Sequence, residues 1–284
     1  MPEQRVLVLG ANGQLGKALR AEFPTAVFYG REECDLSQPE KVSELPFDTC
    51  DVIINAAAYT AVDAAETPEG AALAEAVNAS AVEALSVLAA EREILLVHVS
   101  TDYVFDGTKK SPYLETDQFN PLGVYAQTKA QGDLAVQKAP RHYLLRTSWV
   151  IGEGNNFVRT MAALAERGIK PSVVNDQIGR LTFTQDLAAA IRHLIDSKAP
   201  FGTYNLSNEG PASSWADIAA QVYELTGHDP VDVTGVTTEE YFAGKEGIAP
   251  RPLWSMLDLS KIEATGFIPA SWEARLASYF SQLD

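Results

Sequence analysis

Five short apolar runs lie along the first half of the chain and predict buried strands. They cover residues 5–9, 26–29, 52–55, 94–100 and 143–147. Each run is apolar throughout rather than alternating, as is typical of strands covered on both faces of a sheet. The runs therefore predict a sheet that lies between two layers of other structure.

Helical patterns separate these runs, at residues 14–22, 39–45, 69–90 and 124–138. Regular alternation of strand and helix predicts a parallel sheet with right-handed crossover connections. We therefore expect an α/β fold, a Rossmann-type doubly wound parallel sheet, over residues 1–150.

The pattern changes after about Trp149. Elements become shorter, and the loops at 152–156 and 208–211 are rich in Gly, Pro and Asn. Further helical patterns follow at 157–167, 184–197, 215–226 and 271–283. We expect a smaller α+β domain over residues 151–284 that binds substrate, with a segment near 180–200 returning to the first domain.

Charge narrows the possible partners. The 284 residues include 38 acidic and 22 basic side chains, for a formal net charge of −16. Such a chain repels nucleic acid and anionic lipid unless Lys and Arg are concentrated somewhere, and no such run exists. The most apolar helical segment, 71–90, is interrupted by Glu75, Asn78 and Glu83. We therefore expect neither a nucleic-acid partner nor a membrane span.

The chain contains two cysteines, Cys34 and Cys50. Two cysteines in a chain of this length do not form a disulfide framework or a metal motif. The N-terminal residues lead directly into the first strand and lack the layout of a signal peptide. These features predict a cytoplasmic protein with reduced thiols.

Three glycines follow the first strand and open the first helix. Gly10 permits a tight turn, Gly13 leaves room for a pyrophosphate, and Gly16 lets the helix pack closely on the strand. The helix N-terminus then offers free N–H groups to phosphates. This segment predicts a dinucleotide site formed by Gly10, Asn12, Gly13, Gln14, Leu15 and Gly16.

The end of the second strand suggests which dinucleotide binds. An acidic residue there would bind the ribose hydroxyls of NAD, but the chain has Gly30 followed by Arg31. A guanidinium fits phosphate geometry well. We therefore predict NADPH as the cofactor, with NADH possible because Glu32 and Glu33 oppose this preference.

Tyr125 and Lys129 are four residues apart on a predicted helix, which stacks them on one face about 6 Å apart along the axis. We expect the ammonium of Lys129 to lower the pKa of the Tyr125 phenol. Tyr125 could then protonate a carbonyl oxygen as hydride reaches its carbon. Thr101, at the end of the fourth strand, could hold the same oxygen by a hydrogen bond.

Two further residues could contact a ligand. Trp149 follows the fifth strand, where an aromatic face could stack on a sugar or a base; the alternative is a core residue at the interface between domains. Arg251 lies between two prolines and could bind a diphosphate, or could simply be an exposed side chain. Asp63 and Glu66 are interpreted as first-turn helix residues favoured by the helix dipole.

Several segments together resemble one family, namely residues 58–66, 100–107, 146–149, 154–157, 175–177 and 251–255. The chain resembles the extended short-chain dehydrogenases/reductases, and among them the reductases of dTDP-linked 4-keto sugars. The resemblance covers nearly the whole chain. It implies NADPH-dependent reduction of the C4 keto group of dTDP-6-deoxy-L-lyxo-4-hexulose to dTDP-L-rhamnose.

The resemblance also implies roles for individual residues. It makes Thr101, Tyr125 and Lys129 the catalytic residues. It places Thr101, Asp102 and Trp149 against the sugar nucleotide. Lys129 would also hold the nicotinamide ribose. The cofactor would be lined by Gly13, Gln14, Leu15, Asp35, Leu36, Ala57, Ala58 and Tyr59.

The sequence departs from the family at Leu181, where a proline is usual, and we expect local effects only. Lys17 and Ala18 stand where enterobacterial members use a glutamate in a magnesium-linked dimer. We therefore predict no metal and a monomer or weak homodimer. Two alternatives remain open: another sugar-nucleotide epimerase or dehydratase, or a non-catalytic regulatory subunit on the same fold.

Overall fold

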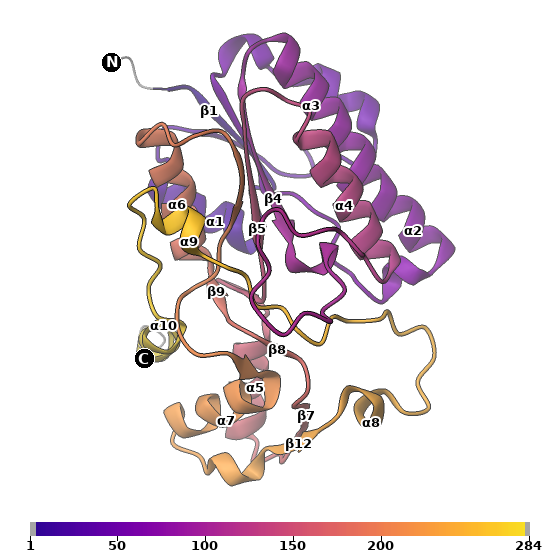
Figure 1. The fold of residues 1–284 in the computed structure, drawn as a ribbon, viewed down its shortest axis with the longest axis vertical. Helices are drawn as coiled ribbons and strands as arrows, with labels where there is room; N and C mark the ends of the chain where they lie inside the picture. Colours follow the sequence, from indigo (N-terminus) through magenta and orange to yellow (C-terminus); the bar gives the residue numbers. More distant parts are fainter. Residues whose placement is uncertain (1–3, 282–284) are drawn as a thin grey trace.

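A six-stranded sheet lies at the centre of the larger lobe (Figure 1). The computed structural model describes residues 4–281. The strands run in the order β2-β1-β3-β4-β5-β10, and every neighbouring pair is parallel. Their bounds are β1 (Val6–Leu9), β2 (Val27–Tyr29), β3 (Val52–Asn55), β4 (Leu95–Thr101), β5 (His142–Thr147) and β10 (Gly202–Asn205).

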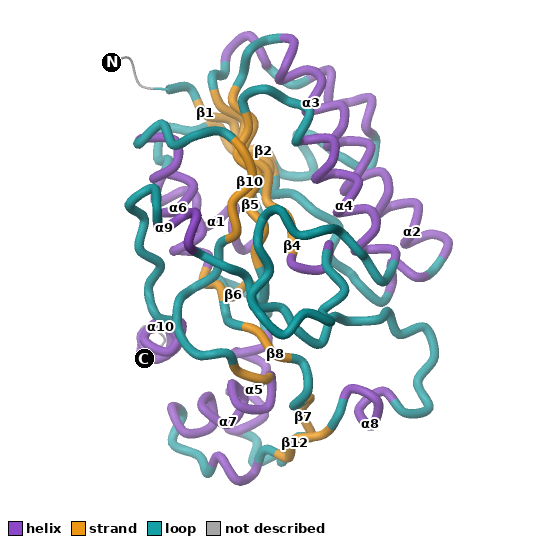
Figure 2. Tube along the Cα trace, viewed as in Figure 1, coloured by secondary structure: helices purple, strands orange, loops and turns teal. Residues whose placement is uncertain are grey.

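Helices cover both faces of this sheet (Figure 2). On one face lie α1 (Gln14–Glu22), α6 (Thr184–Asp196) and α9 (Ser260–Glu263), and on the other α2 (Pro68–Glu75), α3 (Ala81–Glu91) and α4 (Val124–Val136). Side chains of a strand alternate between faces, so Val6 and Val8 join one core while Leu7 and Leu9 join the other. This is why the runs are apolar without alternation.

The predicted parallel α/β sheet is confirmed, and all five predicted strands are present. The sixth strand, β10, was not predicted; it pairs with β5 after α6 has packed against α1. The helix predicted at 39–45 is a 3₁₀ helix, η1 (Pro39–Glu44), rather than an α-helix. Leu45 precedes Pro46 and is extended, because proline disfavours helical geometry in the preceding residue.

The helix predicted at 69–90 contains a π-helical turn, η4 (Ala76–Ser80), between α2 and α3. By length and composition the combined segment Pro68–Glu91 could cross a membrane, and it is the single such helix in the part of the chain that the structure describes. In the structure it packs beside α4, and α3 contributes Val82 and Leu85 to the core.

The smaller lobe has a core of its own around the fully buried Trp272. Its helices are α5 (Phe157–Glu166), α7 (Trp215–Leu225), α8 (Thr238–Phe242) and α10 (Trp272–Ser281), and the end of the helix predicted at 271–283 lies outside the described residues. Short strand pairs join β12 (Thr234–Val236) to β7 (Ser172–Val174), β11 (Ser213–Ser214) to β8 (Ile178–Gly179), and β6 (Val150–Ile151) to β9 (Thr182–Phe183). Other 3₁₀ turns are η2 (Phe47–Thr49), η3 (Ala64–Glu66), η5 (Asp102–Val104) and η6 (Pro230–Asp232).

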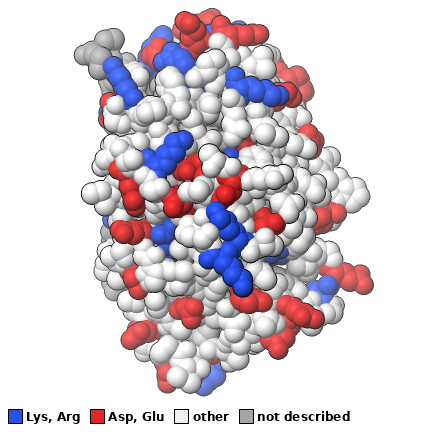
Figure 3. Space-filling view, viewed as in Figure 1, with Lys and Arg blue, Asp and Glu red and all other residues white. Residues whose placement is uncertain are grey.

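The distribution of charged side chains on the surface is consistent with the net negative charge of the chain. On the face shown in Figure 3, Lys and Arg form only small groups bordered by Asp and Glu. This face therefore offers no extended basic surface for a polyanion.

We predict that Gly132 is required where α4 crosses the π-helical turn. A Cβ atom at Gly132 would lie 2.3 Å from the backbone oxygen of Asn78. We expect Gly132→Ala to lower the free energy of unfolding by about 1–3 kcal/mol, as overpacking does, despite the better helix propensity of alanine. Chemical denaturation measures this change. Leu134→Ala, at an exposed position of the same helix, is the control and should change stability by less than about 0.5 kcal/mol.

Candidate active site

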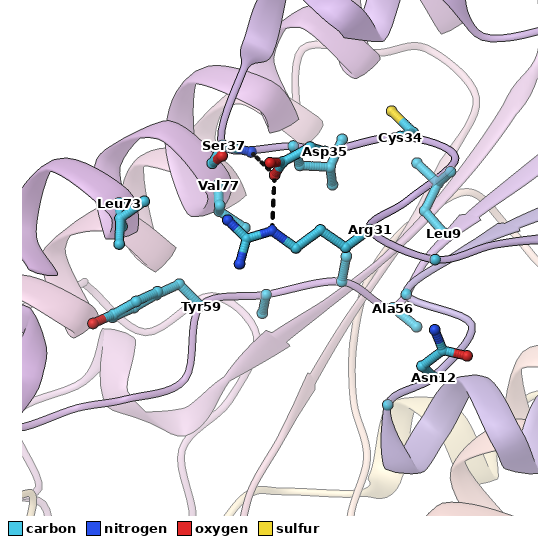
Figure 4. A pocket seen from close by; sticks show the side chains of 16 residues that line it. Leu9, Asn12, Arg31, Cys34, Asp35, Ser37, Ala56, Tyr59, Leu73 and Val77 are labelled. Atoms are coloured by element: carbon cyan, nitrogen blue, oxygen red, sulfur yellow. Dashed lines mark hydrogen bonds and ion pairs between the residues drawn. The ribbon is translucent and has the colours of Figure 1, made fainter.

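A cavity of about 340 Å³ opens at the carboxyl ends of β1, β2 and β3 (Figure 4). Open parallel sheets bind ligands at this end of their strands. Nine of the predicted cofactor residues line it, namely Gly10, Asn12, Gly13, Arg31, Asp35, Leu36, Ala57, Ala58 and Tyr59. Gln14, Leu15 and Gly16 belong to α1 and do not line the cavity wall.

The glycines of the first turn differ in what they permit. Gly10 has a left-handed φ of +85°, and a Cβ atom there would lie 2.6 Å from the backbone nitrogen of Ala57. A Cβ atom at Gly16 would lie 2.1 Å from the oxygen of Gly10. Gly13 has no such close neighbour and lines the cavity. Packing therefore requires the outer two glycines, and the middle one leaves the backbone open to a ligand.

The rim of the cavity at the end of β2 carries both signs of charge. The side chain of Arg31 is 75% exposed, and its Nε lies 3.3 Å from Oδ1 of Asp35 (Figure 4). Hydrogen bonds from Ser37, together with Arg31, lower the pKa of Asp35. Glu33 turns back to accept a hydrogen bond from the backbone of Gly30 at 2.7 Å. The end of β2 therefore does carry a carboxylate, but it comes from Glu33, three residues after Gly30, rather than from the strand end itself.

Asn78 holds the cavity wall in place. It is 1% exposed in the π-helical turn, accepts a hydrogen bond from Tyr59 N at 2.9 Å and donates one to Tyr59 O at 3.0 Å. Its amide therefore binds the wall as a neighbouring strand would. The pattern of the sequence assigned no role to Asn78 beyond interrupting an apolar segment, because its partner lies 19 residues away.

Tyr125 lies in the first turn of α4, buried and edge-on to Tyr103 at 5.6 Å between ring centroids. The N-terminus of α4 is held by Glu66, which accepts a hydrogen bond from Val124 N at 2.8 Å. Burial raises the pKa of Tyr125, while its hydrogen bond with Thr101 acts in the opposite direction. The expected lowering of this pKa by Lys129 is therefore wrong for the structure described.

Lys129 is itself buried, with 2% of its surface exposed. Its Nζ donates a hydrogen bond to Val99 O at 2.8 Å and lies 3.3 Å from Nε2 of His98. Burial lowers the pKa of Lys129 to about 8, and Asp133 opposes this shift. The ammonium cannot simply stabilise a phenolate, because the same apolar surroundings disfavour both charges.

An ion pair anchors the other end of α4. Asp133 and Arg146 of β5 are both fully buried, with 2.9 Å between Oδ2 and Nε. Arg146 also donates to Glu115 O at 2.9 Å and lies 4.7 Å from the ring centroid of Phe119. These contacts fix the helix that carries Tyr125 and Lys129 against the strand beside β4.

Asp102 follows Thr101 at the end of β4 and is 3% exposed. Its Oδ1 accepts a hydrogen bond from the Thr101 hydroxyl at 3.1 Å, and its buried Oδ2 has no hydrogen-bond partner among the described residues. Burial raises the pKa of Asp102 to about 6, although hydrogen bonds from Ser255 and Thr101 counter it. An acceptor beside Thr101 is thus available to a ligand.

The predicted substrate residues lie toward the smaller lobe. Trp149 has a left-handed φ of +46° and stacks on Trp215, with 3.8 Å between ring centroids. One face of its indole is therefore already covered. Arg251 binds both carboxylate oxygens of Asp63, at 2.8 and 2.9 Å, and lines a second cavity of about 320 Å³ beside Phe242.

Asp63 is the N-cap residue of η3 and Glu66 lies in its single turn, as expected, but the side chains make long-range contacts that the helix dipole does not explain. Asp63 also accepts a hydrogen bond from Ala249 N at 3.0 Å, and neither carboxylate caps η3. Both side chains bind segments far away in the sequence, 186 residues for Ala249 and 58 for Val124. They join the loop after β3 to the smaller lobe and to α4.

At the position of the magnesium-linked glutamate, Lys17 forms an ion pair with Glu153 at 2.6 Å. Among residues 4–281, no group of three or more His, Cys, Asp or Glu side chains is arranged to hold a metal ion. The absence of a metal remains a prediction.

The Rossmann-type sheet, the glycine turn and the buried Thr101, Tyr125 and Lys129 define a short-chain dehydrogenase/reductase. Within that class, the family model described as the RmlD substrate binding domain matches residues 4–284. The chain therefore belongs to the RmlD family.

Known relatives agree along the whole chain. A protein of Aggregatibacter actinomycetemcomitans, named dTDP-4-dehydrorhamnose reductase, is 37% identical over 292 residues, covering 96% of this chain and 97% of its own. The solved reductase of Clostridium acetobutylicum has a TM-score of 0.91 at 36% identity, covering 98% of this chain and 99% of its own. The reductase of Bacillus anthracis, solved with NADP, has a TM-score of 0.90 at 34% identity and covers 99% of both chains.

Asp102 should make stability depend on pH. Its folded pKa of about 6 lies above the ordinary value of 3.8, so the folded state disfavours the carboxylate. The stability contributed by the protonated form is therefore lost as the pH rises through 6. Asp102→Asn removes this pH dependence. We therefore expect its free energy of unfolding, relative to that of wild type, to be about 1–2 kcal/mol higher at about pH 8 than at about pH 5. Urea denaturation at both pH values measures this difference.

Asp106→Asn is the matched control for this prediction. Hydrogen bonds from Thr108 and Asn120 lower the pKa of Asp106 to about 2, so the folded state favours this carboxylate. The free energy of unfolding of Asp106→Asn, relative to that of wild type, should therefore not increase between the lower and the higher pH. An Asp102→Asn effect of equal size at both pH values would contradict the prediction.

Proposed function

We propose that this protein uses NADPH to reduce the C4 keto group of dTDP-6-deoxy-L-lyxo-4-hexulose, producing dTDP-L-rhamnose. One observation carries the proposal: Thr101, Tyr125 and Lys129 are all buried where β4 and α4 meet, with Thr101 hydrogen-bonded to Tyr125 and Lys129 hydrogen-bonded to Val99 of β4. The names of the relatives support the same substrate. The chain would act as a cytoplasmic monomer or weak homodimer.

The cavity at the ends of β1 to β3 fits a dinucleotide. Its backbone is exposed at Gly13, and a Cβ atom at Gly10 would collide with the wall opposite. The adenosine half would lie between Leu36 and Tyr59, and Arg31 would bind the 2′-phosphate. When bound, the nicotinamide group supplies the hydride.

Tyr125 would donate the proton. Reduction of a ketone needs an acid at the carbonyl oxygen, and burial keeps the Tyr125 phenol protonated at neutral pH. The Thr101 hydroxyl, which donates to Asp102 at 3.1 Å in this structure, would turn its single O–H to the same oxygen and stabilise its developing charge. Lys129 would hold the ribose of the cofactor from the next turn of α4.

The sugar nucleotide would extend from Tyr125 toward the second cavity. Arg251 lies at this boundary, and its guanidinium could bind a diphosphate while remaining close to Asp63. Trp149 is partly exposed, and the part of its indole that Trp215 and Gly179 leave free would contact the sugar or the base. Asp102 would accept a sugar hydroxyl at its unpartnered oxygen.

We predict that Tyr125→Phe lowers kcat by roughly 10²–10⁴-fold, because the proton donor is lost. The assay follows consumption of NADPH with the dTDP-linked keto sugar and, separately, its UDP analogue. Tyr103→Phe is the matched control, since it removes a hydroxyl from the neighbouring ring and should retain most activity. Full turnover by Tyr125→Phe would refute the role. Stoichiometric NAD⁺ on the purified protein would favour an epimerase or dehydratase.

The choice of cofactor should depend on Arg31. We expect Arg31→Ala to lower kcat/KM for NADPH roughly tenfold, the loss of one charged hydrogen bond, and to leave NADH nearly unchanged. Glu33→Gln should shift the preference further toward NADPH, because it removes a negative charge beside the ribose. Steady-state kinetics with both cofactors measures both effects. A wild-type preference of tenfold or more for NADH would refute the assignment.

A further inference from the structure

His98 lies in the middle of β4, fully buried between β3 and α4. Its Nδ1 is 3.1 Å from Nδ2 of Asn55, and its Nε2 is 3.3 Å from Nζ of Lys129. Burial together with Lys129 lowers the pKa of His98 well below its ordinary value, so the imidazole is neutral. None of the roles described above uses this side chain.

The hydrogen bonds around His98 determine which ring nitrogen carries the proton. Oδ1 of Asn55 accepts a hydrogen bond from Ala57 N at 3.1 Å, which turns the amide nitrogen of Asn55 toward His98. Nδ1 must therefore accept. A neutral imidazole has one N–H group, and it lies on Nε2, pointing at Lys129.

This arrangement favours a neutral Lys129. Nζ donates to Val99 O, and an uncharged amine has a lone pair that can accept from Nε2–H of His98. An ammonium has no acceptor, so two donors would face each other. Protonated Lys129 needs the other tautomer of His98, and Nδ1–H then requires Oδ1 of Asn55. Rotating that amide removes the acceptor of Ala57 N.

We infer that His98 is a positioning residue that couples the protonation of Lys129 to the orientation of the Asn55 amide, and through it to Ala57 in the wall of the dinucleotide cavity. One proton on Lys129 thus changes the hydrogen bonding of the cavity wall across β3 and β4. The consequence for catalysis rests on the proposed function, whereas the coupling itself does not.

Other charges around Lys129 leave this coupling in place. From α4, Asp133 favours the ammonium, but it is committed to Arg146 of β5. Tyr125, one turn earlier on α4, is an uncharged phenol because burial raises its pKa. From β4 the facing groups are His98 and Val99 O, and from β3 the polar group is the neutral amide of Asn55.

Nuclear magnetic resonance of ¹⁵N-histidine-labelled protein tests the inference directly. Long-range ¹H–¹⁵N spectra distinguish the two tautomers, and His98→Gln assigns the signal among the four histidines. We expect the Nε2–H tautomer at high pH. It should convert to Nδ1–H as the pH falls through the pKa of Lys129, near 8, and this change should vanish in Lys129→Met.

Several outcomes of this titration would overturn the inference. They are an Nδ1–H tautomer at high pH, no change near pH 8, or a change that persists in Lys129→Met. The measurement needs no substrate, so an inactive protein would refute the proposed function and leave this result standing.

Kinetics then connects the coupling to activity. The glutamine side chain in His98→Gln can offer an oxygen to the Lys129 ammonium and should therefore raise the pKa of Lys129. The limb of the kcat/KM pH profile that reports Lys129 should then move upward by about one pH unit. His142→Gln is the matched control, because His142 is also buried but bonds to Ala139 O. An unmoved limb in a folded His98→Gln protein would contradict the catalytic consequence.

Discussion

The buried ion pair between Asp133 and Arg146 is the contact on which the geometry of the site depends. Asp133 lies on the same face of α4 as Tyr125 and Lys129, each one turn from the next. Arg146 belongs to β5, beside the strand that ends at Thr101. Breaking such a pair leaves an uncompensated buried charge, which costs roughly 3–5 kcal/mol. The anchor therefore fixes the rotation of α4, and with it the distance from the phenol to the end of β4.

Burial, more than any ion pair, sets the acid–base properties of this site. It raises the pKa of Tyr125 and of Asp102, and it lowers that of Lys129. All three shifts favour the uncharged form, as expected in surroundings of low polarity. The phenol of Tyr125 therefore keeps its proton at neutral pH, whereas Asp102, with a pKa of about 6, and Lys129, with a pKa of about 8, titrate close to neutrality. Such a site suits a reaction in which negative charge appears on a substrate oxygen and is neutralised at once.

Local patterns predicted most of the fold, because strand burial, helix period and the glycine turn are properties of neighbouring residues. They also point to Thr101, Tyr125 and Lys129 as candidate catalytic residues, because these lie at element ends or one helical turn apart. Local patterns cannot predict contacts between residues far apart in the sequence, such as the ion pair of Arg251 with Asp63, which are separated by 188 residues. The stacking of Trp149 on Trp215 and the polar role of His98 inside an apolar strand depend on packing that spacing does not encode.

The π-helical turn at Ala76–Ser80 fixes the length of the chain between α2 and α3. A π turn closes its hydrogen bond one residue later than an α turn, and each residue rotates a helix by about 100°. Deleting one residue there would let the segment continue as an ordinary α-helix. Leu85 would then swing out of the core, or Asn78 would leave the backbone of Tyr59. A single surplus residue thus keeps one helix in register with two unrelated surfaces, and no substitution of side chains could replace it.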